Sequence, residues 1–216
     1  MDAFEAWLDY AFNREPAELT DPAWYFRDEG DPPREWITHY ARRDDDTATA
    51  ERIRRLFTNA GELLQPYSDD QVAHGLEFIV NGSCGGEIWT LCAPSVPLAL
   101  RLSGLRSIVP LFRQVFAARL PDHEEARTRL GTTCFMFWDV ANLGPADNDT
   151  VLDVLEDTLA MGSVPCQRAA LHGLGHQFWS AREHVPAIID RWLERRPHAP
   201  EELRTYAAEA RTGMIL

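Results

Sequence analysis

The sequence predicts an all-α fold, because apolar residues recur at helical spacing along nearly the whole chain. Strand signals are poor: sustained alternation of apolar and polar residues is absent, and no Asn-Gly turn has alternating apolar residues on both sides. The chain has 216 residues, of which 45% are hydrophobic, so it can bury a substantial core as one domain over 1–216. We expect about ten helices joined by short turns rich in Pro, Gly and Asp.

Start and stop signals place several of these helices. The segment 68–71 (SDDQ) has the form of a capping box, and 81–82 (Asn-Gly) is typical of the end of the helix that follows it. We expect Asp122 and Glu125 to open a later helix, and 200–202 (PEE) to open the last one. The apolar face predicted for the helix after Asp122 consists of Ala126, Leu130, Cys134, Phe137 and Ala141.

Two segments hint at internal repetition. His74-Gly75-Leu76 is echoed by His172-Gly173-Leu174, and each is followed by a Val-Pro pair that opens a new apolar helix. Antiparallel helix pairs stacked into a HEAT-like array would fit this pattern, and a closed helical bundle is the alternative. The segment 28–33 (DEGDPP) would separate an N-terminal helical cap over residues 1–30.

Composition excludes several classes of function. The 21 basic residues are all Arg, so a Schiff-base lysine, a P-loop lysine and a Ser–Lys dyad are excluded. The net charge of −13 disfavours binding to nucleic acid. No apolar run reaches the roughly 18 residues that a membrane span needs, and no signal peptide is visible, so we expect a cytoplasmic protein.

The four cysteines are expected to be reduced and to pack as small apolar residues, because none forms a C-x-x-C pair. The segment 81–86 (NGSCGG) resembles the nucleophile loop of viral chymotrypsin-like cysteine proteases. That resemblance would require β-barrels, for which the sequence gives no sign. We therefore interpret the segment as a Gly-rich turn between helices.

The segment 166–179 (CQRAALHGLGHQFW) carries His172 and His176 one helical turn apart. Two imidazoles at this spacing share a helix face and can bind zinc or another divalent metal. Gly173 stands where metalloproteases of the HExxH type carry their catalytic glutamate, so that mechanism is absent. The third ligand would come from one of four residues elsewhere in the chain: Asp139, Glu156, Cys166 or His74.

The alternative interpretation of this segment is structural. Glycine costs a helix about 1 kcal/mol relative to alanine, so Gly173 and Gly175 should have a packing reason. We favour close approach of a neighbouring helix, with His172 and His176 as interior packing residues and no cofactor. For Asp139, an ion pair with Arg168 is the favoured interpretation.

Three segments, CQRAALHGLGHQFW, CFMFWD and SDDQVAHGLEFIVNG, resemble parts of uncharacterised bacterial proteins thought to have helical-repeat, HEAT-like folds. The resemblance spans about half of the chain. It implies an α-helical repeat fold and a bacterial source, and it supplies no catalytic residues.

The leading functional hypothesis is a non-enzymatic interaction protein that binds a basic protein partner, as a toxin-neutralising immunity protein would. Residues 1–50 hold 13 acidic residues against 5 Arg, and Asp44, Asp45 and Asp46 are the candidate contact residues. One alternative is a metal-dependent enzyme that uses His172 and His176. Another is a small-ligand pocket on the concave side of the array, lined by Trp and Arg.

Overall fold

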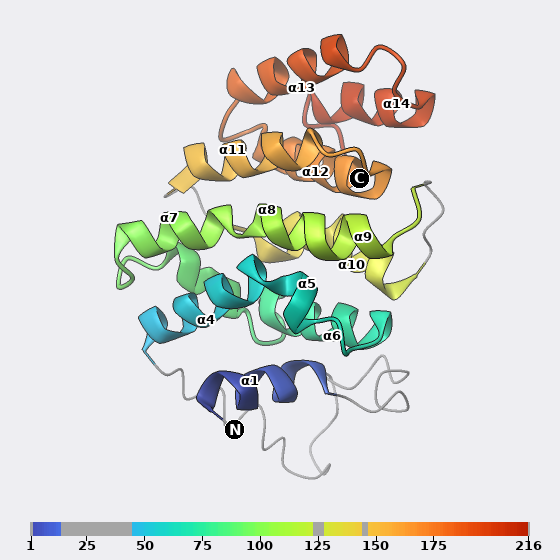
Figure 1. The fold of residues 1–216 in the computed structure, drawn as a ribbon. Coiled ribbons are helices and arrows are strands. Elements are labelled where there is room, and N and C mark those ends of the chain that lie inside the picture. Colours follow the sequence, from blue (N-terminus) through green and yellow to red (C-terminus); the bar gives the residue numbers. More distant parts are fainter. Residues whose placement is uncertain (1, 14–44, 123–127, 144–146, 216) are drawn as a thin grey trace, which may run out of the picture.

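The computed structural model describes residues 2–13, 45–122, 128–143 and 147–215, and over these ranges the chain forms helices and turns without a strand (Figure 1). The all-α prediction is confirmed. The helices are α1 (Ala3–Phe12), α4 (Asp46–Thr58), α5 (Ala60–Leu63), α6 (Asp69–Val80), α7 (Leu98–Arg106), α8 (Ile108–Leu111), α9 (Ala117–Arg119), α10 (Arg129–Ala141), α11 (Asn148–Leu159), α12 (Val164–Gln177), α13 (His184–Arg195) and α14 (Glu201–Ala210). A short 3₁₀ helix, η1 (Glu87–Cys92), follows α6, and a π-helical turn, η2 (Phe112–Phe116), joins α8 to α9.

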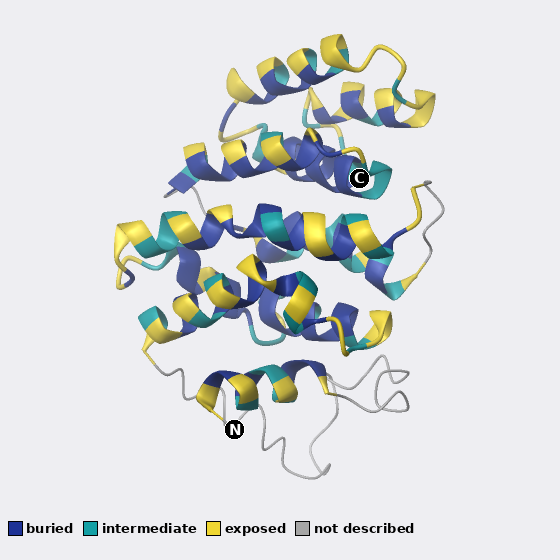
Figure 2. Cartoon of the chain, in the orientation of Figure 1, coloured by how far each residue is buried: buried dark blue, intermediate teal, exposed yellow. Residues whose placement is uncertain are grey.

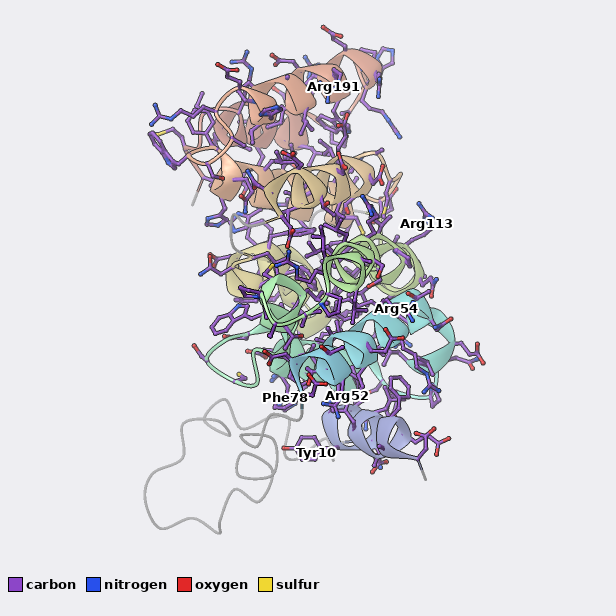
Figure 3. All side chains as sticks on the ribbon, turned by 90° about the vertical axis from the view of Figure 1, so that its left-hand side faces the viewer. Tyr10, Arg52, Arg54, Phe78, Arg113 and Arg191 are labelled. Atoms are coloured by element: carbon purple, nitrogen blue, oxygen red, sulfur yellow. The ribbon has the colours of Figure 1, made fainter. Side chains whose placement is uncertain are left out.

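The helices form two rows that run the length of an elongated stack (Figure 1). In one row α6 contacts α10, α10 contacts α12, and α12 contacts α14. In the other row α4 contacts α7 and α8, and α11 contacts these two helices and α13. The arrangement is the stacked array that the sequence predicts and not the closed bundle. Figure 3 shows the same stack from the side, with Tyr10 near its foot and Arg191 near its top.

Helix α1 lies at the foot of the stack against α6. The rings of Tyr10 and Phe78 meet edge to face at 5.8 Å, and both are labelled in Figure 3. Gly75 of α6 allows α1 to approach closely, because a Cβ atom there would lie 2.8 Å from the Ala11 carbonyl oxygen and 2.3 Å from a ring carbon of Phe12. Residues 14–30 of the predicted cap lie outside the described ranges.

Local signals explain where α6 begins and ends. The Gln71 N–H donates to the Ser68 hydroxyl at 3.3 Å, and the Ser68 N–H donates to the Gln71 side chain at 3.0 Å. This is the predicted capping box. The helix ends at Val80, directly before the predicted stop at Asn81-Gly82.

The predicted start of α10 was wrong. This helix begins at Arg129, and Thr128 is its N-cap, because the Thr128 hydroxyl accepts from the Gly131 N–H at 3.0 Å. The Asp122 carboxylate instead accepts from the Val164 N–H at 2.7 Å and so caps the first turn of α12. Glu125 and Ala126 lie outside the described residues. The rest of the predicted apolar face is buried, as expected: Leu130, Cys134, Phe137 and Ala141.

One hydrophobic core runs through the stack, from Phe4 and Trp7 in α1 to Ala207 and Ala210 in α14. Figure 2 shows the buried residues on the facing sides of the helices and the exposed ones on the outer sides. Helix α12 contacts α10, α11, α13 and α14, so most of its surface is covered. None of the described helices combines the length and apolar character that a bilayer crossing requires.

Candidate metal centre

Helix α12 presents a polar stripe to the gap between α10 and α14. Arg168, His172 and His176 are four residues apart and therefore lie on one helix face. His172 is 3% exposed as a residue, whereas the His176 side chain is 41% exposed. The stripe thus runs from the interior of the protein to its surface.

Asp139 of α10 meets the outer end of this stripe. The Nε2 atoms of His172 and His176 lie 3.1 Å apart, and His176 Nε2 lies 3.5 Å from Asp139 Oδ1. All three ligand atoms are within 4.8 Å of one another. Zinc–nitrogen and zinc–carboxylate bonds of 2.0–2.2 Å at tetrahedral angles place neighbouring ligand atoms roughly 3.3 to 3.6 Å apart. The His176–Asp139 distance falls in this interval, and the spacing between the two imidazoles is slightly shorter.

Two aromatic residues contact the His172 ring on its other sides, and an arginine lies over both of them. The imidazole Nδ1 lies 2.6 Å from the Tyr206 hydroxyl of α14. The ring of Phe135, one turn before Asp139 on α10, packs on the imidazole with centroids 4.3 Å apart. The Arg168 guanidinium lies over the rings of both Phe135 and Tyr206, at 5.2 and 5.5 Å. These contacts fix the direction of Nε2 toward His176.

Burial makes the inner part of this cluster uncharged at neutral pH. Burial is the main cause that lowers the pKa of His172 to about 4; the neighbouring His176 and Arg168 act in the same direction, and Asp139 opposes them. Burial likewise raises the pKa of Tyr206 to about 12. A neutral imidazole with a free Nε2 lone pair is the form that binds a metal.

Of the four candidate third ligands, the structure places Asp139 beside the two histidines. Its Oδ1 lies 3.5 Å from His176 Nε2, whereas we expected an ion pair with Arg168. Glu156 forms a two-pronged ion pair with Arg191 of α13, at 2.9 and 3.0 Å. The other two candidates, Cys166 and His74, are buried on α12 and α6 outside this cluster.

Both glycines of α12 are tightly packed, but only Gly173 meets neighbouring helices as the sequence suggested, whereas Gly175 meets a residue beyond the end of α14. A Cβ atom on Gly173 would lie 2.7 Å from Trp138 Cγ and 2.6 Å from Leu155 Cδ2, and one on Gly175 would lie 2.7 Å from Ile215 Cδ1. The neighbours that approach are side chains and not helix backbones. Tight packing and a histidine cluster therefore coexist in one helix.

The acidic triplet proposed as a partner contact has local structural roles where it is described. The Asp45 carboxylate accepts from the Thr47 N–H at 3.0 Å and so caps α4. The Asp46 carboxylate accepts from the Ser95 hydroxyl at 2.6 Å. Asp44 lies outside the described residues. Binding of a basic partner stays a prediction that these contacts do not test.

The glycine-rich segment 81–86 forms the turn between α6 and η1, as interpreted from the sequence. Its Cys84 is half-buried, and burial together with the charge of Glu77 raises the pKa of this thiol to about 12. A nucleophilic cysteine needs the opposite shift. All four cysteines are free thiols.

A shallow pocket of about 600 Å³ adjoins the cluster. It is lined by Arg168, Glu201, Glu202, Thr205, Tyr206 and Glu209. The arginine of the predicted small-ligand pocket is present, but this lining contains no tryptophan. Tyr206 belongs to the pocket wall and to the histidine cluster at once.

Tyr206 and Phe135 are the residues of the site that the sequence did not reveal. Phe135 lies outside the apolar face predicted for its helix. Tyr206 belongs to no motif, and only the packing of α14 on α12 places it beside His172. No protein-family model, curated protein or solved structure matches this chain, so the functional argument depends on this geometry.

Proposed function

We propose that this protein binds a divalent transition-metal ion, zinc being the first candidate, through His172, His176 and Asp139, and that it acts as a metal-dependent enzyme. The observation that carries the proposal is the meeting of the two Nε2 atoms at 3.1 Å beside a carboxylate. Imidazole nitrogens and a carboxylate oxygen are the donor set that zinc and iron(II) accept.

Hydrogen bonding alone satisfies this cluster less well than a cation would. His176 Nε2 faces both His172 Nε2 and Asp139 Oδ1. A single N–H can point at only one of these acceptors, so one contact is left without a proton. A cation placed among the three atoms would meet a lone pair from each of them.

The exposure of the site supports an enzymatic role over a structural one. Structural zinc sites are closed by four protein ligands, whereas catalytic sites keep a position for water or substrate. Within the described residues the cluster supplies three ligands, and the Asp139 and His176 side chains are each 41% exposed. A bound ion would supply Lewis-acid chemistry and lower the pKa of a coordinated water.

Each protein residue then has a distinct task. His172, buried and neutral, is the fixed anchor of the site. His176 and Asp139 are the solvent-side ligands, and the negative charge of Asp139 offsets part of the charge of the cation. Because Gly173 replaces the glutamate of the HExxH pattern, a metal-bound water would be oriented by a group other than the residue after the first histidine.

Metal titration tests the proposal. Metal-free protein titrated with cobalt(II) should bind one equivalent and develop the visible absorption of a low-coordinate site. His176→Ala should weaken binding at least 100-fold. His184→Ala, which removes an exposed histidine at the start of α13, should leave it unchanged.

The same cobalt-loaded protein reports an open coordination position. Azide should change the visible spectrum of the wild type, because a three-ligand centre leaves room for an external anion. Lack of stoichiometric cobalt(II) and zinc(II) binding would overturn the proposal. Stoichiometric binding with a spectrum insensitive to azide would overturn its enzymatic part.

A further inference from the structure

The contact between α14 and the buried histidine has a consequence for the proposed metal centre. Tyr206 is the residue of α14 whose hydroxyl reaches His172, and the 2.6 Å separation from Nδ1 is that of a strong hydrogen bond. The opposite ring nitrogen is the one that faces His176. Tyr206 and the proposed metal therefore act on the two ends of one imidazole.

The position of one proton links these two ends. A neutral imidazole carries a single N–H, so a free lone pair on Nε2 requires that the proton be on Nδ1. In that tautomer His172 donates from Nδ1 to the Tyr206 oxygen. Metal-binding histidines commonly donate their second N–H to a carboxylate, a backbone carbonyl or a water, and loss of that partner typically costs 10-fold to 100-fold in metal affinity. The Tyr206 oxygen takes this position here.

Packing holds the phenol and the imidazole in this relation. The planes of the two rings are within 10° of parallel, with centroids 6.3 Å apart. Arg168 lies over the phenol ring, and Phe135 packs on the imidazole. Leu203, Ala207 and Ala210 bury the inner face of α14, so the helix presents Tyr206 at a fixed depth.

On this basis, and resting on the proposed metal function, we propose that Tyr206 is a positioning residue that fixes the metal-binding tautomer of His172 and so couples metal affinity to the docking of α14. Coupling of this kind is reciprocal. Docked α14 raises the affinity for the ion, and the bound ion holds α14 more firmly on α12.

The test compares Tyr206→Phe with Tyr67→Phe, in which the lost hydroxyl belongs to a ring packed on Phe12 of α1. Tyr206→Phe should weaken zinc(II) binding 10-fold to 100-fold and alter the cobalt(II) spectrum. Tyr67→Phe should do neither. The thermal midpoints of the two metal-free variants serve as the measure of purely structural effects. Equal zinc(II) affinity in Tyr206→Phe and the wild type would overturn the inference.

A second measurement uses only the wild-type protein, in case Tyr206→Phe does not fold. Amide hydrogen exchange should slow in α14 on addition of zinc(II), by a larger factor than in α6 at the other end of the row. Exchange in α14 that zinc(II) leaves unchanged, in protein shown to bind zinc(II), would overturn the coupling alone. Absence of zinc(II) binding by the wild type would instead contradict the proposed function.

Discussion

Gly173 lies against Trp138 so closely that a Cβ atom on the glycine would stand 2.7 Å from the indole Cγ. Leu155 of α11 fills the same space, because its Cδ2 atom would lie 2.6 Å from that Cβ. The contact joins α12 to two neighbouring helices at the point where His172 enters the interior. The glycine is thus a condition for the packing that brings α10 and its Asp139 to the histidines.

Gly173→Ala should therefore destabilise the protein. Overpacking costs about 1–3 kcal/mol, and the better helix propensity of alanine returns about 1 kcal/mol, so we expect a net loss of up to about 2 kcal/mol. Urea unfolding followed by circular dichroism measures it. Gly162→Ala, in the bend between α11 and α12, is the control for an added methyl group without crowding, because a Cβ there meets nothing within 4 Å. Equal stability of the two variants would show that the neighbours of Gly173 move aside freely.

The sequence predicted the elements whose signals are local. The capping box at Ser68 and Gln71 defines α6 because both partners lie within one helical turn. Asp122 and Thr128 are both good N-cap residues, and nothing local tells which one opens α10. The Asp122 carboxylate finds its partner, Val164, 42 residues along the chain.

In the candidate site, too, features that depend on local spacing could be predicted, and features that depend on helix packing could not. The spacing of His172 and His176 indicates a shared helix face, because it depends only on helix geometry. Asp139 was one of four possible third ligands, and only the packing of α10 on α12 distinguishes it. Tyr206 could not be predicted, since its role comes from the docking of a helix that the sequence marks only by its first turn.

The acidic residues at the start of α4 give a second prediction. Asp45→Ala removes the acceptor for the Thr47 N–H and should cost about 1 kcal/mol of unfolding free energy. Asp153→Ala, on the exposed face of α11, should change it by less than about 0.5 kcal/mol. Denaturant titration distinguishes the two. If the variants are equally stable, Asp45 does not contribute to stability as a cap.

A bound ion should stabilise the folded protein in a way that depends on the site. Zinc(II) at 100 times its dissociation constant adds about 2.7 kcal/mol to the free energy of unfolding, if the unfolded chain does not bind it. We expect the thermal midpoint to rise on zinc(II) addition in the wild type and in His184→Ala. In His176→Ala, whose affinity is at least 100-fold weaker, the same zinc(II) concentration should add no more than about 0.4 kcal/mol, so the midpoint should rise much less. A rise of equal size in all three would assign the effect to other histidines or to the carboxylate-rich surface.

The metal-free protein should lose stability in mild acid because of His172. Its pKa is lowered to about 4 in the folded protein, whereas an unfolded histidine titrates near 6.5. Between these two values the unfolded chain binds more protons than the folded one, so the stability contributed by the neutral imidazole is complete above about pH 6.5 and falls as the pH drops. The total loss is about 3 kcal/mol, with about 2 kcal/mol of it reached by pH 5.

This prediction is checked by urea unfolding in the presence of a chelator, at intervals from pH 7.5 to pH 5. Over this interval the wild type should lose more stability than His172→Gln, which has no group that titrates there. The comparison removes the effect of the carboxylates, because both proteins share them. Parallel stability curves for the two proteins would mean that His172 takes up its proton as easily in the folded protein as in the unfolded chain, and would contradict the burial that makes it a neutral ligand.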